Sequence, residues 1–140
     1  MTAKEYLLEI RDTSKKLYDK LCDIAEIRAQ KDGLKSIELS DKIKSSATYN
    51  SNIDNLLMRE EMLLSEYNEI HKSWWLCREK IEQLDDYDFR RVLRHYYLRA
   101  KPWEQVAQNL HMSERKTFKL HGLALQEFRK KFGDEEFTVY

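Results

Sequence analysis

PWEQVAQNLHMSERKTFKLHGLALQEFRKKF, residues 102–132, contains two helical patterns that only a few residues separate. The first covers residues 103–110 and follows Pro102, whose fixed φ and missing N–H suit the start of a helix. The second begins after Ser113, a favourable N-cap, and ends before Gly133. Two helices this close must turn sharply against each other, so the stretch predicts a helix-turn-helix. The apolar residues at helical spacing predict the faces that meet: Val106, Ala107, Leu110, Thr117, Leu120, Ala124, Leu125 and Phe128.

The side chains outside this contact are mostly basic. A helix that presents Arg and Lys from its first two turns can enter the major groove of DNA, where these side chains donate to guanine edges and phosphates. Arg99 and Lys101, in the loop before Pro102, are placed to contact the DNA backbone. The predicted DNA-binding residues are Ser113, Glu114, Arg115, Lys116, Phe118, Lys119, His121, Arg99 and Lys101.

A solvated charged face on a helical bundle would give the same pattern, and the charge distribution separates the two interpretations. Residues 89–132 hold eleven Lys and Arg against three Asp and Glu, whereas the whole chain has 25 of each. This segment therefore carries a net charge of +8 and the remainder carries −8. Because the basic segment coincides with the predicted helix-turn-helix, DNA binding is favoured.

Residues 81–132 resemble bacterial sigma factor region 4. The residues that carry the resemblance are Tyr96, Trp103, Val106, Ala107, Leu110, Ser113, Leu120, Ala124, Leu125 and Phe128. Gln105 stands where that pattern has Glu, and Thr117 where it has Val or Ile. His111 occupies a position where such motifs usually have Gly and where φ is often positive.

Nearly the whole chain is similar to a family of small phage proteins related to ArpU- and RinA-type late transcription regulators. The matching segments are the opening MTAKEYL, the middle KSSATYNSNID and the later LHGLALQEF. The resemblance implies a phage or prophage protein that controls late or packaging genes, with contacts to RNA polymerase as a further partner.

The composition predicts an all-α chain. Three Gly and one Pro in 140 residues favour long helices, and no segment alternates apolar and polar residues as a strand would. We expect long antiparallel, coiled-coil-like arms over residues 1–84 and the helix-turn-helix domain over residues 85–133. An acidic tail, residues 134–140, follows Gly133.

The arms are predicted from two stripes at alternating spacings of three and four residues. The first helix starts at a Thr2/Glu5 capping box and should end near Gln30, followed by a loop at about residues 31–51. The second helix should run from about residue 53 to 84, with Asp85 and Asp86 as its breakers and as caps of the next helix. Its apolar face is too wide for one partner helix, which favours a homodimer or a higher homo-oligomer. The first stripe is Leu7, Ile10, Ser14, Leu17, Leu21, Ile24 and Arg28; the second is Ile53, Leu56, Glu60, Leu63, Tyr67, Ile70, Trp74, Cys77, Ile81 and Leu84.

Neither an enzyme nor a membrane protein is expected. The motif spacings of phosphate-binding loops and zinc hydrolases are missing, so we predict no catalytic residue, cofactor or metal. No run approaches the roughly 18 apolar residues of a membrane span. Cys22 and Cys77 lie in or beside apolar stripes, which predicts buried free thiols and the reducing cytoplasm of a bacterial host cell.

Two other functions stay open. A DNA-packaging adaptor of the small terminase kind also joins a helix-turn-helix to helical oligomerisation arms, although there the DNA-binding module usually comes first. Alternatively, the chain is a helical protein–protein interaction module whose motif serves packing alone. Mass in solution and binding to random duplex at low salt distinguish these possibilities.

Overall fold

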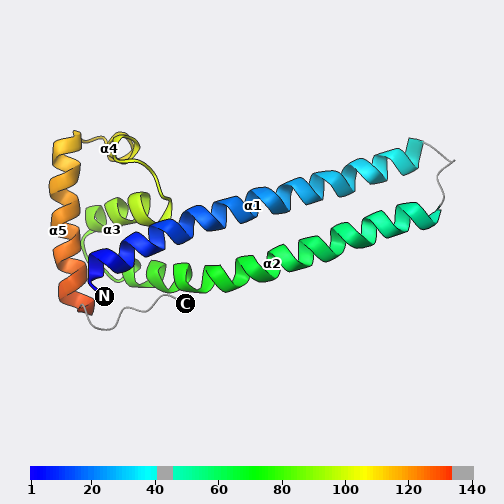
Figure 1. The fold of residues 1–140 in the computed structure, drawn as a ribbon. Helices are drawn as coiled ribbons and strands as arrows, with labels where there is room; N and C mark the ends of the chain where they lie inside the picture. The colour runs from blue at the N-terminus through cyan, green and yellow to red at the C-terminus, as the bar shows by residue number, and fades with distance from the viewer. Residues whose placement is uncertain (41–45, 134–140) are drawn as a thin grey trace. The chain divides into compact units, whose positions relative to one another are not determined.

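The computed structural model describes residues 1–40 and 46–133, and these residues form helices and no strand (Figure 1). The predicted all-α class is therefore confirmed, whereas the predicted acidic tail lies outside the described residues. The elements are α1 (Ala3–Ser40), α2 (Ser46–Glu82), α3 (Tyr87–Leu93), the π-helical turn η1 (Arg94–Leu98), α4 (Trp103–Leu110) and α5 (Glu114–Phe132).

The chain forms two compact units, and α1 and α2 each contribute to both. The first unit, called the bundle below, holds residues 1–16 and the described part of residues 70–140. The second, called the hairpin, holds the described part of residues 17–69, where α1 and α2 run side by side in opposite directions (Figure 1). The functional division between residues 84 and 85 stays a prediction.

Predicted capping residues fix several helix ends. At the start of α1 the Thr2 N–H donates to Glu5 Oε2 over 3.0 Å, and the Glu5 N–H donates to Thr2 Oγ1 over 3.1 Å. Before α3, Asp86 Oδ1 accepts from the N–H groups of Asp88 and Phe89. These side chains satisfy N–H groups that have no partner inside the helix, so the helices begin where the sequence predicts.

The predicted loop at residues 31–51 is wrong over most of its length. Helix α1 continues past Gln30 and Gly33 to Ser40, and α2 already begins at Ser46. Only residues 41–45 of the predicted loop lie outside the described residues. A glycine inside a helix costs about 1 kcal/mol relative to alanine, which weakens a helix but does not end it.

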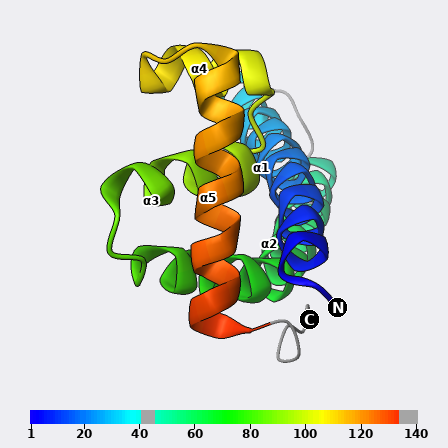
Figure 2. The ribbon, with the colours of Figure 1, turned by 90° about the vertical axis from the view of Figure 1, so that its left-hand side faces the viewer.

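The bundle is built around one apolar core to which every one of its helical segments contributes. Tyr6, Leu7 and Ile10 of α1 are buried in it, and Phe128 of α5 stacks on Tyr6 with ring centroids 6.4 Å apart. Helix α5 packs against both α3 and α4, as Figure 2 shows from its exposed side. The other buried core residues are Ala3, Cys77, Ile81, Leu84, Val92, Leu93, Tyr97, Leu98, Val106, Leu110 and Ala124.

The π-helical turn changes which residues after α3 reach the core. A regular helix from Phe89 onward predicts Tyr96 on the buried face, yet Tyr97 and Leu98 are buried and Tyr96 is only partly buried. In η1 the Arg99 N–H donates to Arg94 O five residues earlier, over 3.0 Å. The wider turn rotates the following side chains relative to an α-helix, which shifts the buried set by one residue.

The hairpin has a thin apolar core and ion pairs across it. Leu17, Ile24, Ile27 and Leu56 are its buried hydrophobic residues in the part of the chain that the structure describes. Glu60, which interrupts the second apolar stripe, pairs with Lys31 (2.7 Å) and Arg28 (3.8 Å). The hydrogen bond from Lys31 is the main cause that lowers the pKa of Glu60. Lys20 pairs in the same way with Glu66.

The two cysteines differ in burial. Cys22, expected to be buried, is exposed, whereas Cys77 is buried, and burial raises the pKa of its thiol to about 12.

The turn between α4 and α5 gives a first prediction about stability. His111 has φ 55° and ψ 42°, in the left-handed region that a side chain disfavours. We expect His111→Gly to raise the free energy of unfolding by about 0.5–1 kcal/mol, measured by urea denaturation. The control is Gln108→Gly, which places the same residue at a helical position of α4 and should lower stability by about 0.5 kcal/mol. Equal effects of the two substitutions would contradict the strain at His111.

Candidate nucleic-acid interface

Helices α4 and α5 pack through the faces that the sequence predicts. Val106, Ala107 and Leu110 of α4 are buried, as are Thr117, Ala124 and Phe128 of α5. Leu120 and Leu125 are partly buried against the same core. Because Ala107 is buried at 4% exposure, a larger side chain there would have to displace its neighbours.

Three residues, 111–113, connect the two helices, and hydrogen bonds fix their backbone. The Met112 N–H donates to Ala107 O over 3.0 Å, which closes the end of α4. Ser113 Oγ accepts from the Lys116 N–H over 3.1 Å and caps α5, as predicted. Thr117, which replaces the Val or Ile of the sigma pattern, donates its buried hydroxyl to Ser113 O over 2.8 Å. The threonine is therefore compatible with the core because its polar group has a partner.

The first two turns of α5 present their charged side chains to solvent. Glu114, Arg115, Lys116 and Lys119 are all exposed, and Ser113 before them is exposed as well. Arg115 and Lys119 are four residues apart, so they share one face of the helix. None of the three basic side chains forms an ion pair within residues 1–40 and 46–133. Their charge is therefore not neutralised by that part of the chain.

An aromatic cluster supports this end of α5. Trp103 stacks on Tyr96 with ring centroids 3.8 Å apart and an interplanar angle of 14°. The ring centroids of Phe118 and Trp103 are 5.0 Å apart, and Phe118 is still 48% exposed. The contact connects the second turn of α5 to the start of α4, two residues after Lys101. The predicted residues of the loop and of α5 thus belong to neighbouring parts of the fold.

His121 does not point away from the protein, and the prediction that it does is wrong. Its Nε2 lies 2.6 Å from Tyr97 Oη in a hydrogen bond. The centroid of its ring lies 4.6 Å from that of Trp103 and 5.9 Å from that of Tyr96. Burial, with a smaller effect of the Lys4 charge, lowers the pKa of His121 to about 4. The helical spacing of α5 leaves the direction of the His121 side chain open, and its contacts with Tyr96 and Tyr97 turn it toward the protein.

Arg99 and Lys101 lie in a segment of concentrated positive charge. Arg99 is exposed, with Nη1 3.4 Å from His95 Nδ1, and Lys101 is partly buried. Burial lowers the pKa of His95, and the charges of Arg99, Arg91, Arg94 and Lys101 lower it further. The lowered pKa of His95 and the concentration of cations around it mark a region where the potential favours an anion.

Sequence reasoning missed the residues that hold this segment in place. Arg11 Nε donates to Tyr96 O over 3.1 Å, and its guanidinium lies 4.4 Å from the centre of the Tyr96 ring. Ser14, an interruption of the first apolar stripe, donates its hydroxyl to Tyr97 O over 2.8 Å. An isolated polar residue in an apolar stripe was the available signal, but its partner is 83 residues away in the sequence.

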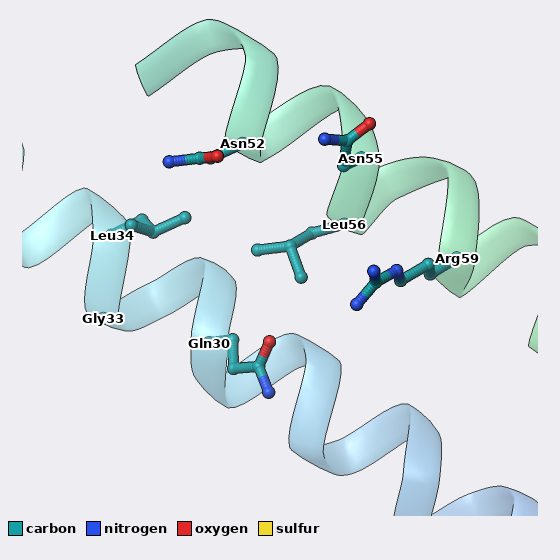
Figure 3. A pocket seen from close by; sticks show the side chains of 7 residues that line it. All are labelled: Gln30, Gly33, Leu34, Asn52, Asn55, Leu56 and Arg59. Carbon is teal, nitrogen blue, oxygen red and sulfur yellow. The ribbon is translucent and has the colours of Figure 1, made fainter. Parts of the chain in front are cut away.

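The hairpin contains a groove of about 440 Å³ between its two helices (Figure 3). Leu34 and Leu56 point toward each other across it, whereas Gly33 contributes no side chain. The other lining residues are Gln30, Asn52, Asn55 and Arg59. Within the described residues, no group of three His, Cys, Asp or Glu side chains is placed to hold a metal ion.

No family model, curated protein or solved structure matches this chain. Among residues 1–40 and 46–133, no helix combines the length and the apolar character that a membrane crossing requires.

The environment of His121 predicts a pH dependence of stability. Because the pKa falls from 6.5 to about 4 on folding, the unfolded chain takes up a proton at a pH where folded His121 stays neutral. The free energy of unfolding should be highest above pH 6.5 and fall by on the order of 2 kcal/mol by pH 4, a value reduced for the partial exposure of the ring. Urea denaturation across this range measures the loss, and the imidazole proton shifts in NMR give the pKa.

The matched variant is His121→Gln, which cannot titrate and should lose this part of the pH dependence. A midpoint near 6.5 for His121 in the folded chain would show that its ring is not held as described.

Proposed function

We propose that this chain is a sequence-specific transcription regulator that binds double-stranded DNA, with α5 in the major groove. The observation that supports this best is the exposure of Arg115, Lys116 and Lys119 in the first two turns of a helix whose opposite face is packed on α4. Guanidinium and ammonium groups in this position can donate to guanine O6 and N7 or to phosphates. Glu114 can accept from cytosine N4, and Phe118 can contact a thymine methyl group.

Contacts to the DNA backbone would set the position of α5. Ser113 caps the amino end of α5, where N–H groups and the helix dipole favour a phosphate. Arg99 and Lys101 precede α4 and can neutralise phosphates from a second element. Contacts from two elements fix an orientation on the duplex that one helix alone leaves free.

The resemblance of residues 81–132 to sigma factor region 4, and of the whole chain to phage late regulators, supports the same class of function. On this proposal the protein is encoded by a phage or prophage, acts in the host cytoplasm on late or packaging genes, and contacts RNA polymerase as a further partner.

The hairpin is proposed to join two copies of the chain. Its core is thin, and several of its large apolar side chains are exposed: Tyr18, Leu21, Leu57, Met58 and Met62. Met58 and Met62, one helical turn apart on α2, are 62% and 59% exposed. A second hairpin can bury these residues in a four-helix arrangement and remove them from water. A twofold dimer would then require an inverted repeat in the DNA, with half-sites a whole number of turns apart.

DNA binding is tested by removing the two basic residues that share one face of α5. We expect Arg115→Ala with Lys119→Ala to abolish specific binding, at a loss of more than about 100-fold in affinity, because each residue can supply about 1–3 kcal/mol of base readout. The measurement is fluorescence anisotropy on a duplex selected from a random pool, over a series of salt concentrations.

The control is Lys16→Ala with Lys130→Ala, which removes the same charge from two exposed residues outside the proposed surface. Circular dichroism should show unchanged helicity in both variants. A wild-type chain that does not bind random duplex at low salt would instead indicate the protein–protein module.

The proposed dimer gives a prediction for mass in solution. Sedimentation equilibrium should give twice the 17.0 kDa of one chain, and Leu21→Lys with Leu57→Lys should give monomers because both apolar side chains, 49% and 42% exposed, lie on the hairpin. Leu8→Lys, at an exposed position of the bundle, should leave the dimer intact. Eight or more subunits would favour the DNA-packaging adaptor, and a monomeric wild type would exclude this use of the hairpin.

A further inference from the structure

A hollow of about 380 Å³ lies in the bundle between the last turns of α2 and the π-helical turn η1. Its volume is within the range of small-molecule sites. It is lined by Trp74, Arg78, Glu82, Arg94, Leu98 and Arg99. Three guanidinium groups in one hollow point to an anion, because Arg binds carboxylates and phosphates through paired N–H groups.

The π-helical turn brings two of these arginines together. The Arg99 N–H bonds to Arg94 O, so Arg99 lies one wide turn above Arg94. In an α-helix, two residues five positions apart point in clearly different directions, because each residue rotates by about 100°. Such π-turns occur frequently at functional sites. Ala100, directly after Arg99, has φ 53°, a strained value for a residue other than glycine.

The charge of the hollow is not balanced. Arg94 pairs with Glu82. Arg78 lies over the ring of Trp75, 4.8 Å from its centre, and Arg99 Nη1 lies 3.4 Å from His95 Nδ1. Among residues 1–40 and 46–133, no carboxylate pairs with Arg78 or Arg99. The lining therefore carries two positive charges in excess.

One wall of the hollow is apolar. The indole N–H of Trp74 donates to Leu98 O over 3.1 Å, so the polar atom of this side chain is already satisfied. Trp74 therefore offers the hollow its ring, and Leu98 adds an aliphatic side chain. An aromatic surface beside cationic groups suits a phosphate that is attached to a sugar and a base.

We propose that this hollow binds the phosphate group of a nucleotide, either free or as part of DNA. A phosphate monoester carries between −1.5 and −2 charges at pH 7 and three acceptor oxygens, which fits two excess charges and three arginines better than a single carboxylate does. A free nucleotide would be an effector and is independent of the function proposed above. A DNA phosphate is a diester with one negative charge, so it would balance only part of the excess; it would extend the interface of Arg99 and rests on that proposed function.

The test uses the full chain and NMR signals from the hollow itself. Adenosine monophosphate and inorganic phosphate should shift the Trp74 indole N–H and the Arg78, Arg94 and Arg99 Nε–H signals in a saturable manner. Sodium chloride at equal ionic strength should not. We expect Arg78→Gln to weaken phosphate binding about tenfold, since it removes a charged hydrogen-bond donor. Arg78→Lys, which keeps the charge, should recover part of the affinity.

The control is Lys16→Gln with Lys130→Gln, two exposed cations outside the hollow, which should leave the affinity unchanged. Thermal denaturation checks that each variant is folded. A Trp74 signal that moves with adenosine monophosphate but not with duplex assigns the site to a free nucleotide. A shift with duplex that adenosine monophosphate reverses assigns it to DNA.

Shifts that do not saturate, equal shifts with chloride, or affinity unchanged by Arg78→Gln would overturn the proposal. Binding of an acidic peptide in preference to all phosphates would overturn it as well. The result is separate from that of Arg115→Ala with Lys119→Ala: a chain that binds adenosine monophosphate in the hollow but no duplex keeps this site and loses the proposed function.

Discussion

Three consecutive backbone carbonyls at the end of η1 hold the bundle together. Carbonyls in the last turn of a helix have no partner within it, and a buried polar group without a partner costs on the order of 1–3 kcal/mol. Side chains from α1 and α2 supply the missing donors, so η1 can end inside the bundle only with both helices beside it. The bonds are Arg11 Nε–H to Tyr96 O (3.1 Å), Ser14 Oγ–H to Tyr97 O (2.8 Å) and Trp74 Nε1–H to Leu98 O (3.1 Å).

The position of α4 and α5 follows from this arrangement. Once the Tyr96 carbonyl is held by Arg11, the Tyr96 ring is fixed as a platform on which Trp103 stacks at 3.8 Å. Trp103 is the first residue of α4, and its ring also contacts Phe118 of α5. The orientation of the basic face of α5 thus depends on residues of α1 that are about 100 positions away in the sequence. A mutation of Arg11 can therefore affect the orientation of α5 from a distant part of the sequence.

Local signals in the sequence are sufficient to predict where α1, α3 and α5 begin, and longer-range contacts explain several of the errors. Ser113 and Asp86 cap their helices through bonds that span three residues, so the sequence alone identifies them. The π-turn has no such local signal, because side chains from two other helices stabilise it. His121 shows the same limitation: its helical phase allows either orientation, and the bond to Tyr97 decides. Gly33 caused a different error: the sequence predicts that the first helix ends near Gln30, before this glycine, but a single glycine does not end a long helix.

The charge distribution along the sequence shows where a chain with no net charge would bind the proposed anion. Residues 17–69 hold eleven acidic and seven basic residues, whereas residues 89–132 have an excess of eight basic ones. A polyanion is repelled by the first segment and attracted by the second, so the proposed binding is favoured at the second segment. Uniformly distributed cations would bind DNA in many orientations. On the proposed function, the separation of charge along the sequence favours contact at residues 89–132, which include Arg94, Arg99 and α5.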